Sequence, residues 1–133
     1  MRALLDTNVL IRFLTSDKTK KFKGVYRLFE SLEQGDCRVE LKLIVLFQVI
    51  FVLTSYYAVP RGDAARGILG ILQYKGIVIK EKRIVRRMIE LWHDSRLDIV
   101  DCYLVACLEG DKQNILYSYD HDFDKFGINR QEP

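Results

Sequence analysis

Short apolar runs alternate along most of this sequence with longer stretches whose apolar residues recur at helical spacing. The short runs predict strands at residues 3–5, 37–41, 77–79 and 115–119. The longer stretches predict helices at residues 9–14, 18–34 and 44–57, after the turn at residues 60–63, around residues 84–92 and at residues 98–110. This alternation favours an α/β fold, with a largely parallel sheet and helices on both of its faces.

The stretch from Ile44 to Tyr57 is apolar on almost every side and predicts a buried helix. Gln48 is the only polar residue between Leu43 and Leu53, so we expect its side chain to face a polar group inside the protein. A core glutamine that bonds to the backbone is the simpler alternative. The sequence leaves both interpretations open.

Length and composition indicate one globular domain that covers residues 1–133. Hydrophobic residues make up 49% and charged residues 29%, the balance of a chain that can bury a substantial core. The net charge of +3 permits a nucleic-acid partner without requiring one. Three cysteines without paired spacing argue against a disulfide framework or a zinc ribbon, and they predict buried, reduced thiols.

No segment of the sequence predicts a membrane span or a secretory signal. The N-terminal apolar stretch is interrupted at Asp6, too early for the hydrophobic region of a signal peptide. The longest apolar run, residues 41–53, contains Lys42 and Gln48 and is too short to cross a bilayer. We therefore expect a cytoplasmic protein without a membrane partner.

Acidic residues follow two of the predicted strands. Asp6 comes directly after residues 3–5, and Asp120 comes directly after residues 115–119. Binding sites in open parallel sheets form at the carboxyl ends of the strands, which makes both residues candidates for a site. Taken singly, Asp6 is explained as well by a helix cap and Asp120 by an ordinary acidic loop.

Asp101 is harder to explain, because it lies inside a predicted helix among mainly apolar neighbours at helical spacing. An unpaired carboxylate in such a place costs several kcal/mol, so it needs a cation or strong hydrogen-bond donors. An internal salt bridge to an arginine is the alternative to a metal ion. If Asp6, Asp101 and Asp120 converge, their mutual repulsion requires a cation, and an all-oxygen set of ligands favours Mg²⁺ or Mn²⁺.

With these residues in this order, the sequence resembles the PIN-domain ribonucleases, and among them the VapC-type toxins of toxin–antitoxin pairs. The resemblance covers nearly the whole chain and lies in four segments, LLDTNVLIRFL, VLFQVIFVLTSYY, LDIVDCYLVA and YSYDHDF. It implies a compact, three-layer α/β/α sandwich, a divalent metal ion and endonucleolytic cleavage of RNA. It assigns the catalytic and metal-binding positions to Asp6, Asp101 and Asp120, and it matches Asp122 to a further acidic position.

One position departs from the family pattern, which has a glutamate where this sequence has Gln48. A glutamine can offer its carbonyl oxygen to a metal ion or to a water molecule, but it carries no charge and accepts no proton. Weaker metal binding and slower cleavage are therefore expected. A catalytically impaired PIN-fold protein that binds RNA or an antitoxin is the alternative function.

The expected reaction is metal-dependent hydrolysis that leaves a 5′-phosphate and a 3′-hydroxyl. Arg12, close to Asp6 in the sequence, is the best single candidate for a contact to an RNA phosphate. Two basic clusters offer further contacts, although each is explained as well by a solvated helix face: Lys18, Lys20, Lys21 and Lys23, and Lys80, Lys82, Arg83, Arg86 and Arg87. The resemblance also implies a VapB-like antitoxin and a homodimer.

Two other enzyme classes are disfavoured by single residues. A phosphate-accepting receiver domain would need a lysine at the end of a late strand, where this sequence has Tyr119 and Asp120. His93 and His121 are isolated in the sequence, so they predict surface residues rather than the imidazole pair of a metal-free ribonuclease.

Overall fold

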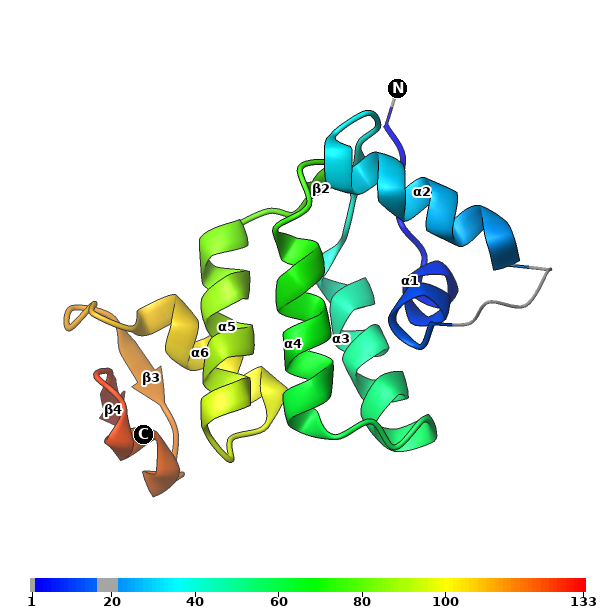
Figure 1. The fold of residues 1–133 in the computed structure, drawn as a ribbon. Coiled ribbons are helices and arrows are strands. Elements are labelled where there is room, and N and C mark those ends of the chain that lie inside the picture. The colour runs from blue at the N-terminus through cyan, green and yellow to red at the C-terminus, as the bar shows by residue number, and fades with distance from the viewer. Residues whose placement is uncertain (1, 17–21) are drawn as a thin grey trace. The chain divides into compact units, whose positions relative to one another are not determined.

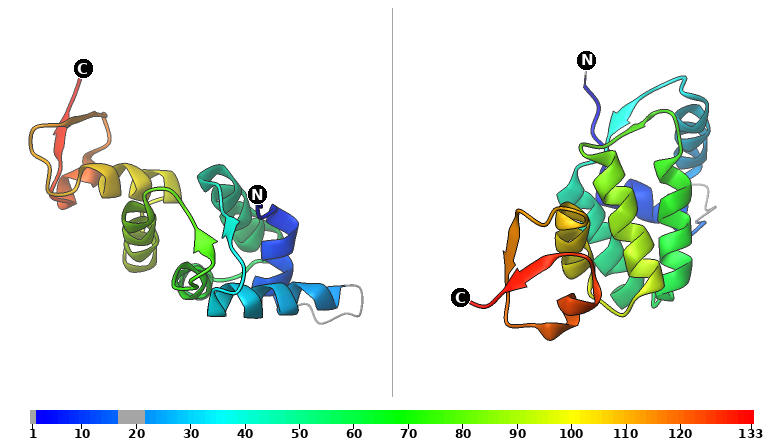
Figure 2. Two further views of the ribbon diagram at one scale, coloured as in Figure 1. Left: turned by 90° about the horizontal axis from the view of Figure 1, so that it is seen from above. Right: turned by 90° about the vertical axis from the view of Figure 1, so that its left-hand side faces the viewer.

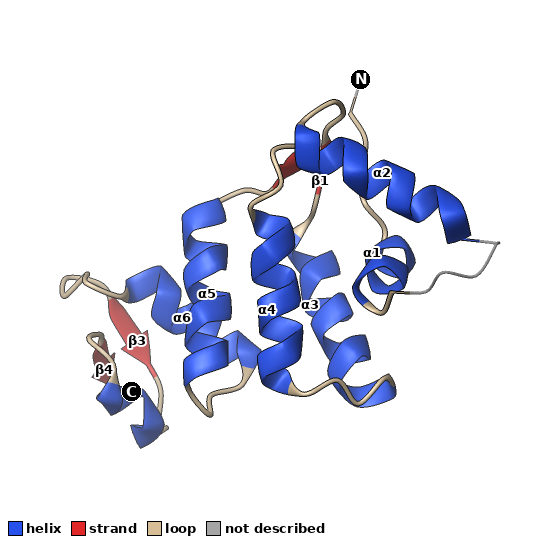
Figure 3. Ribbon diagram, in the orientation of Figure 1, coloured by secondary structure: helices blue, strands red, loops and turns tan. Residues whose placement is uncertain are grey.

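A computed structural model of the chain describes residues 2–16 and 22–133. Two compact units make it up, Met1–Lys82 and Arg83–Pro133. Helices dominate both units, and the strands are short (Figures 1 and 3). Three residues of the first basic cluster, Lys18, Lys20 and Lys21, lie outside the described residues.

The first unit combines helices with a small parallel sheet. Its elements are α1 (Thr7–Leu14), α2 (Lys23–Gln34), β1 (Val39–Glu40), α3 (Leu43–Phe51), the π-helical turn η2 (Val52–Tyr56), α4 (Arg61–Leu72) and β2 (Ile77–Val78). Val39 pairs with Ile77 in parallel register, and Leu4 forms an isolated parallel bridge to Glu40. The predicted strand at residues 3–5 is therefore present as a single bridge, which places Asp6 at the end of this segment.

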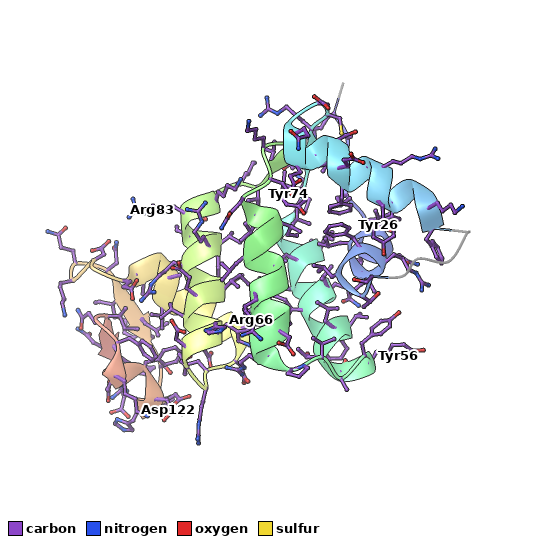
Figure 4. All side chains as sticks on the ribbon, viewed as in Figure 1. Tyr26, Tyr56, Arg66, Tyr74, Arg83 and Asp122 are labelled. Atoms are coloured by element: carbon purple, nitrogen blue, oxygen red, sulfur yellow. The ribbon has the colours of Figure 1, made fainter. Side chains whose placement is uncertain are left out.

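An aromatic cluster fixes α1 against α2. Phe13 and Phe29 stack almost in parallel, with 4.0 Å between ring centroids. Tyr26 and Tyr74 contact Phe13 at centroid distances of 6.0 and 6.3 Å, and both tyrosines are labelled in Figure 4. Offset and edge-on contacts between rings add to the free energy gained by burying their apolar surface. The cluster thus fixes the helix that begins directly after Asp6.

The helix that contains Gln48 buries one face and exposes the other, so the predicted fully buried helix is wrong. Its buried residues recur at helical spacing, at Leu46, Val49, Ile50 and Leu53. Gln48 lies on the opposite, exposed face, which we call the α3 outer face and which also carries Ile44, Phe51 and Tyr56. The expectation that Gln48 points to a polar group inside is therefore also wrong, because the 3.6-residue period turns position 48 away from the core.

Gly76 precedes β2 at a point where the chain leaves no room for a side chain. A Cβ atom there would lie 2.1 Å from the carbonyl oxygen of Cys37 and 3.0 Å from the Cα atom of Leu32. The backbone of Gly76 is also fixed on both sides, since its N–H donates to Leu32 O (2.7 Å) and its carbonyl accepts from Val39 N (2.9 Å). A small shift of the chain cannot relieve the clash without breaking these bonds.

The substitution Gly76→Ala is expected to destabilise the protein by about 1–3 kcal/mol, the usual cost of overpacking. Gly70→Ala is the matched control, because a Cβ atom at position 70 of α4 meets no atom within 4 Å. Alanine favours a helix over glycine, so this control should stabilise the protein by up to about 1 kcal/mol. Urea denaturation of the two variants measures both values, and shifts of the same sign would contradict the packing argument.

The second unit contains two helices of the predicted kind and a second parallel strand pair. Its elements are α5 (Lys82–Asp94), which begins at the boundary residue, α6 (Ile99–Leu108), β3 (Ile115–Tyr117), the 3₁₀ helix η3 (His121–Lys125) and β4 (Asn129–Gln131). β3 and β4 lie side by side, with Ile115 opposite Asn129 (Figures 1 and 2). β4 was not predicted, because its residues are polar and show no apolar alternation.

The predicted α/β class is confirmed: helices alternate with strands, and every strand pairing among the described residues is parallel. The prediction of buried thiols holds only for Cys102. Cys37 is half-buried, and Cys107 is exposed on the outward side of α6. In the described ranges, no helix has the length and apolar character needed to cross a bilayer.

Candidate functional site

Asp6 occupies the N-cap position of α1, between the Leu4 bridge and the first helical turn. Its backbone is extended, with φ −89° and ψ 154°, and its carbonyl accepts from Leu10 N at 3.3 Å. The side chain makes no capping hydrogen bond and is exposed. The capping alternative therefore explains the position of Asp6 but not its carboxylate, which has no hydrogen bond or ion pair among the described residues.

Asp101 lies in the first turn of α6, for which Asp98 is the N-cap residue. The Asp101 side chain is half-buried. In the part of the chain that the structure describes, no arginine, lysine or hydrogen-bond donor contacts its carboxylate. The internal salt bridge that was the alternative to a metal ion is thus absent from the described residues.

Burial raises the pKa of the Asp101 carboxyl group, and the neighbouring carboxylates of Asp98, Asp120 and Asp122 raise it further. In the pH range between the ordinary pKa of 3.8 and the raised one, the folded protein binds more protons at this group than the unfolded chain does. Ionised Asp101 therefore reduces the stability of the fold at neutral pH. A cation beside it would remove this cost.

The loop that follows β3 supplies the next two carboxylates. Asp120 is the N-cap residue of η3, and its Oδ1 accepts from Asp122 N at 2.8 Å. The backbone N–H of Asp120 donates to Ser118 Oγ at 3.0 Å. Asp122, labelled in Figure 4, is exposed like Asp120. Asp120 thus caps η3, a role not expected from the sequence, but the cap uses only one of its two carboxylate oxygens.

The chemistry of this group fits a hard divalent cation. Its members are carboxylates, and none of them forms an ion pair within the described ranges: Asp98, Asp101, Asp120 and Asp122. All-oxygen donors with excess negative charge are what Mg²⁺ and Mn²⁺ prefer. The geometry is incomplete, however, because no three acidic, histidine or cysteine side chains of the described residues lie close enough together to hold a metal ion. A cation here needs at least one further ligand.

Other candidates from the sequence are held by local contacts. Arg12 donates from Nε to Asn8 Oδ1 (3.0 Å), and its guanidinium lies over the Phe22 ring, 4.2 Å from the centroid. Glu40 forms ion pairs with Lys42 (2.8 Å) and Arg2 (3.1 Å), and the hydrogen bond from Lys42 is the main cause that lowers its pKa. Glu40 is therefore held in ion pairs with Lys42 and Arg2. It does not substitute for the glutamate that the family pattern has at position 48.

One arginine of the second basic cluster is also held by an ion pair. Arg87 donates to both carboxylate oxygens of Glu109, at 2.7 and 3.0 Å, and this bond raises the pKa of Arg87. Arg87 is thereby removed from the candidate phosphate contacts, whereas Arg83 and Arg86 are exposed on α5, where Figure 4 labels Arg83.

Each histidine has an aspartate partner of its own. His93 Nδ1 lies 2.7 Å from Asp94 Oδ1, and His121 Nδ1 lies 3.1 Å from Asp124 Oδ2. Both histidines are exposed, as the sequence predicted for surface residues.

Arg130, in the middle of β4, was not among the site residues predicted from the sequence. Its guanidinium contacts Ser118, His121 and Asp124, which belong to the loop that carries Asp120 and Asp122. No local signal could have revealed it, because the contacts join residues six to twelve positions apart across an unpredicted strand pairing. The structure thus adds a cation that contacts the acidic loop through an ion pair with Asp124.

Comparison with known proteins gives one family. The model of the PIN domain family matches residues 3–129, so the match includes Asp6 and the acidic residues of the second unit. Proteins with this domain are generally nucleases that need a divalent metal ion. Among curated proteins, nothing matched the sequence.

Proposed function

This chain belongs to the PIN-domain family, and from that premise we propose that it is a metal-dependent endoribonuclease, the toxin of a type II toxin–antitoxin pair. The main support for the proposal is the environment of the Asp101 carboxylate. This carboxylate is half-buried next to three other carboxylates, and it has no cation partner among the described residues. Structural carboxylates are normally paired when they are buried, so an unpaired group of this kind points to a ligand that is charged and positive.

We propose Asp6, Asp101 and Asp120 as the residues that would hold Mg²⁺ or Mn²⁺. The Asp6 side chain, which makes no capping hydrogen bond, and the carboxylates of Asp98, Asp120 and Asp122 that raise the pKa of Asp101 support this assignment. Asp122 and Gln48 are proposed as additional contacts to the metal ion or to a water molecule. The family match spans both units, which supports one PIN-like domain over residues 1–133.

The proposed site would work by electrostatics and proton transfer. A bound divalent cation supplies Lewis-acid stabilisation of the scissile phosphate and lowers the pKa of water. The carboxylates of the chain orient the attacking water, and one of them accepts its proton. Arg12, Arg83 and Arg86 would contribute positive charge for the RNA backbone, with an affinity that falls as salt concentration rises.

The proposed partners are a VapB-like antitoxin and a second copy of the chain. Support comes from the α3 outer face, where Phe51 is 65% and Tyr56 is 79% exposed. Large apolar residues grouped on a surface are typical of protein interfaces. The alternative function is an impaired PIN-fold protein that binds RNA or antitoxin without cutting. Gln48 is the residue that favours it.

RNA cleavage by the purified protein is expected to require added Mn²⁺ or Mg²⁺ and to stop when EDTA is added. Gel electrophoresis of a labelled RNA measures cleavage, and digestion by a 5′-phosphate-dependent exonuclease identifies the product ends. We expect 5′-phosphate and 3′-hydroxyl ends, because a water molecule rather than the ribose 2′-hydroxyl attacks the phosphate. Products with 2′,3′-cyclic phosphates, or cleavage that is unchanged in EDTA, would refute the proposed mechanism.

A further inference from the structure

Arg130 projects from the middle of β4, and its side chain is only 9% exposed. Its Nε donates to Asp124 Oδ1 at 2.7 Å, and its Nη2 donates to Asp124 Oδ2 at 3.2 Å. Its Nη1 donates to the carbonyl oxygen of Ser118 at 2.8 Å, and Nη2 also lies 2.9 Å from His121 Nδ1. One rigid guanidinium therefore holds three residues of the loop.

These three residues surround the two proposed metal ligands in the loop. Ser118 precedes Asp120 by two positions, His121 separates Asp120 from Asp122, and Asp124 follows Asp122 by two positions. Inside this frame, Asp120 N donates to Ser118 Oγ and Asp122 N donates to Asp120 Oδ1. The segment from 118 to 124 is thus fixed at both ends by Arg130 and internally by its own hydrogen bonds.

Arg130 forms its ion pair with Asp124 and not with the two proposed metal ligands. Asp124 takes the guanidinium in a two-bond contact, and this contact is the main cause that lowers the pKa of Asp124. His121 Nδ1 lies within hydrogen-bond distance of both members of this pair, 2.9 Å from Arg130 Nη2 and 3.1 Å from Asp124 Oδ2. Arg130 therefore forms its ion pair with Asp124, and neither Asp120 nor Asp122 forms an ion pair with it among the described residues.

We propose that Arg130 is a positioning residue, which holds the 118–124 segment so that the Asp120 and Asp122 carboxylates are pre-arranged for a divalent cation. This inference rests on the proposed function, because it assigns these carboxylates to a metal ion. Residues that orient metal ligands in this way typically change metal affinity by about 10–100-fold when they are replaced. An arginine is suited to the task, because its planar fork fixes direction as well as distance.

The test compares Arg130→Gln with Arg87→Gln. Arg87 makes the same kind of two-bond contact, to Glu109, in the same unit and away from the acidic loop, so it controls for the loss of one arginine–carboxylate pair. Calorimetric titration with Mn²⁺ is expected to show about 10–100-fold weaker binding for Arg130→Gln and an unchanged constant for Arg87→Gln. Asp124→Asn removes the same contact from the other side and should weaken Mn²⁺ binding in the same direction, which guards against a folding defect of one variant.

A second measurement needs no metal ion. Hydrogen exchange at the Asp122 amide, which bonds to Asp120 Oδ1, should be faster in Arg130→Gln than in the wild type and unchanged in Arg87→Gln. Arg130→Lys keeps the charge but loses the fork, so it should restore exchange and Mn²⁺ affinity only in part.

Cleavage assays separate positioning from a general structural role. At saturating Mn²⁺ the Arg130→Gln variant should approach the wild-type kcat, while the Mn²⁺ concentration for half-maximal rate should rise about as much as the dissociation constant. Wild-type exchange and wild-type Mn²⁺ affinity in Arg130→Gln would overturn the inference. Faster exchange in a protein whose wild type binds no Mn²⁺ would instead overturn the proposed function and support Arg130 as the residue that positions this loop.

Discussion

Asp101→Asn is expected to abolish RNA cleavage and, at the same time, to stabilise the metal-free protein at neutral pH. Asparagine keeps the size of the side chain but removes the charge that a divalent cation needs. Replacing residues that only orient a metal ligand already costs about 10–100-fold, so removing a ligand should cost at least about a hundredfold in cleavage rate. If the chain is the proposed toxin, overexpression of the wild type should arrest growth of a host, and overexpression of Asp101→Asn should permit it.

The gain in stability follows from the direction of the pKa shift. Burial and the nearby carboxylates raise the pKa of Asp101, so the wild type loses stability as pH rises from the ordinary value of 3.8 through the raised pKa. The asparagine variant does not titrate and avoids this loss. Thermal unfolding in the absence of metal should show a difference between the two proteins that grows over this range and then remains constant.

Asp36→Asn is the control for Asp101→Asn, because Asp36 is exposed in the loop after α2 and has no place in the proposed site. It should leave cleavage unchanged. Added Mn²⁺ should raise the melting temperature of the wild type and of this control but not that of Asp101→Asn, since a ligand stabilises only the fold that binds it. An active Asp101→Asn variant would remove Asp101 from the proposed site.

Gln48→Glu is expected to strengthen Mn²⁺ binding and to accelerate cleavage, each by about 10–100-fold. A glutamate would add one charged oxygen ligand or a proton acceptor where the glutamine offers only a neutral carbonyl oxygen. The exposed position of Gln48 on α3 means that the new carboxylate enters no apolar core. Cleavage rates over a series of Mn²⁺ concentrations measure both effects.

Gln34→Glu provides the matched control, because it adds the same charge at an exposed position at the end of α2. It should change neither affinity nor rate. If the wild type is inactive and Gln48→Glu cuts RNA, the alternative of an impaired binding protein is correct for the natural sequence. If both proteins cut at the same rate at every Mn²⁺ concentration, residue 48 does not belong to the site.

Features that depend on residues close together in the sequence were predicted well. The apolar spacing that ends at Gly35 is an example: Phe29 and Leu32 are buried, and Gly35 closes α2 with a left-handed φ of 82°. Asp101 is another, because its apolar neighbours in the sequence already indicated a carboxylate without an obvious partner. In both cases the information lies within one or two helical turns.

Features that depend on distant partners were predicted poorly. The strand expected at residues 37–41 is reduced to Val39–Glu40, because its length is set by the partner strands rather than by its own alternation. Arg130 and β4 were missed for the same reason. The outward direction of Gln48 was also missed, since an apolar run gives no sign of which side the rest of the protein will cover.

The apolar residues of the α3 outer face are unfavourable when the chain is alone in water. Ile44, Phe51 and Tyr56 present hydrocarbon to solvent there, and such side chains promote nonspecific aggregation. The tendency to aggregate disappears when another macromolecule covers these side chains. Production of the chain alone should therefore be limited by solubility, and co-expression with the proposed antitoxin should relieve that limit.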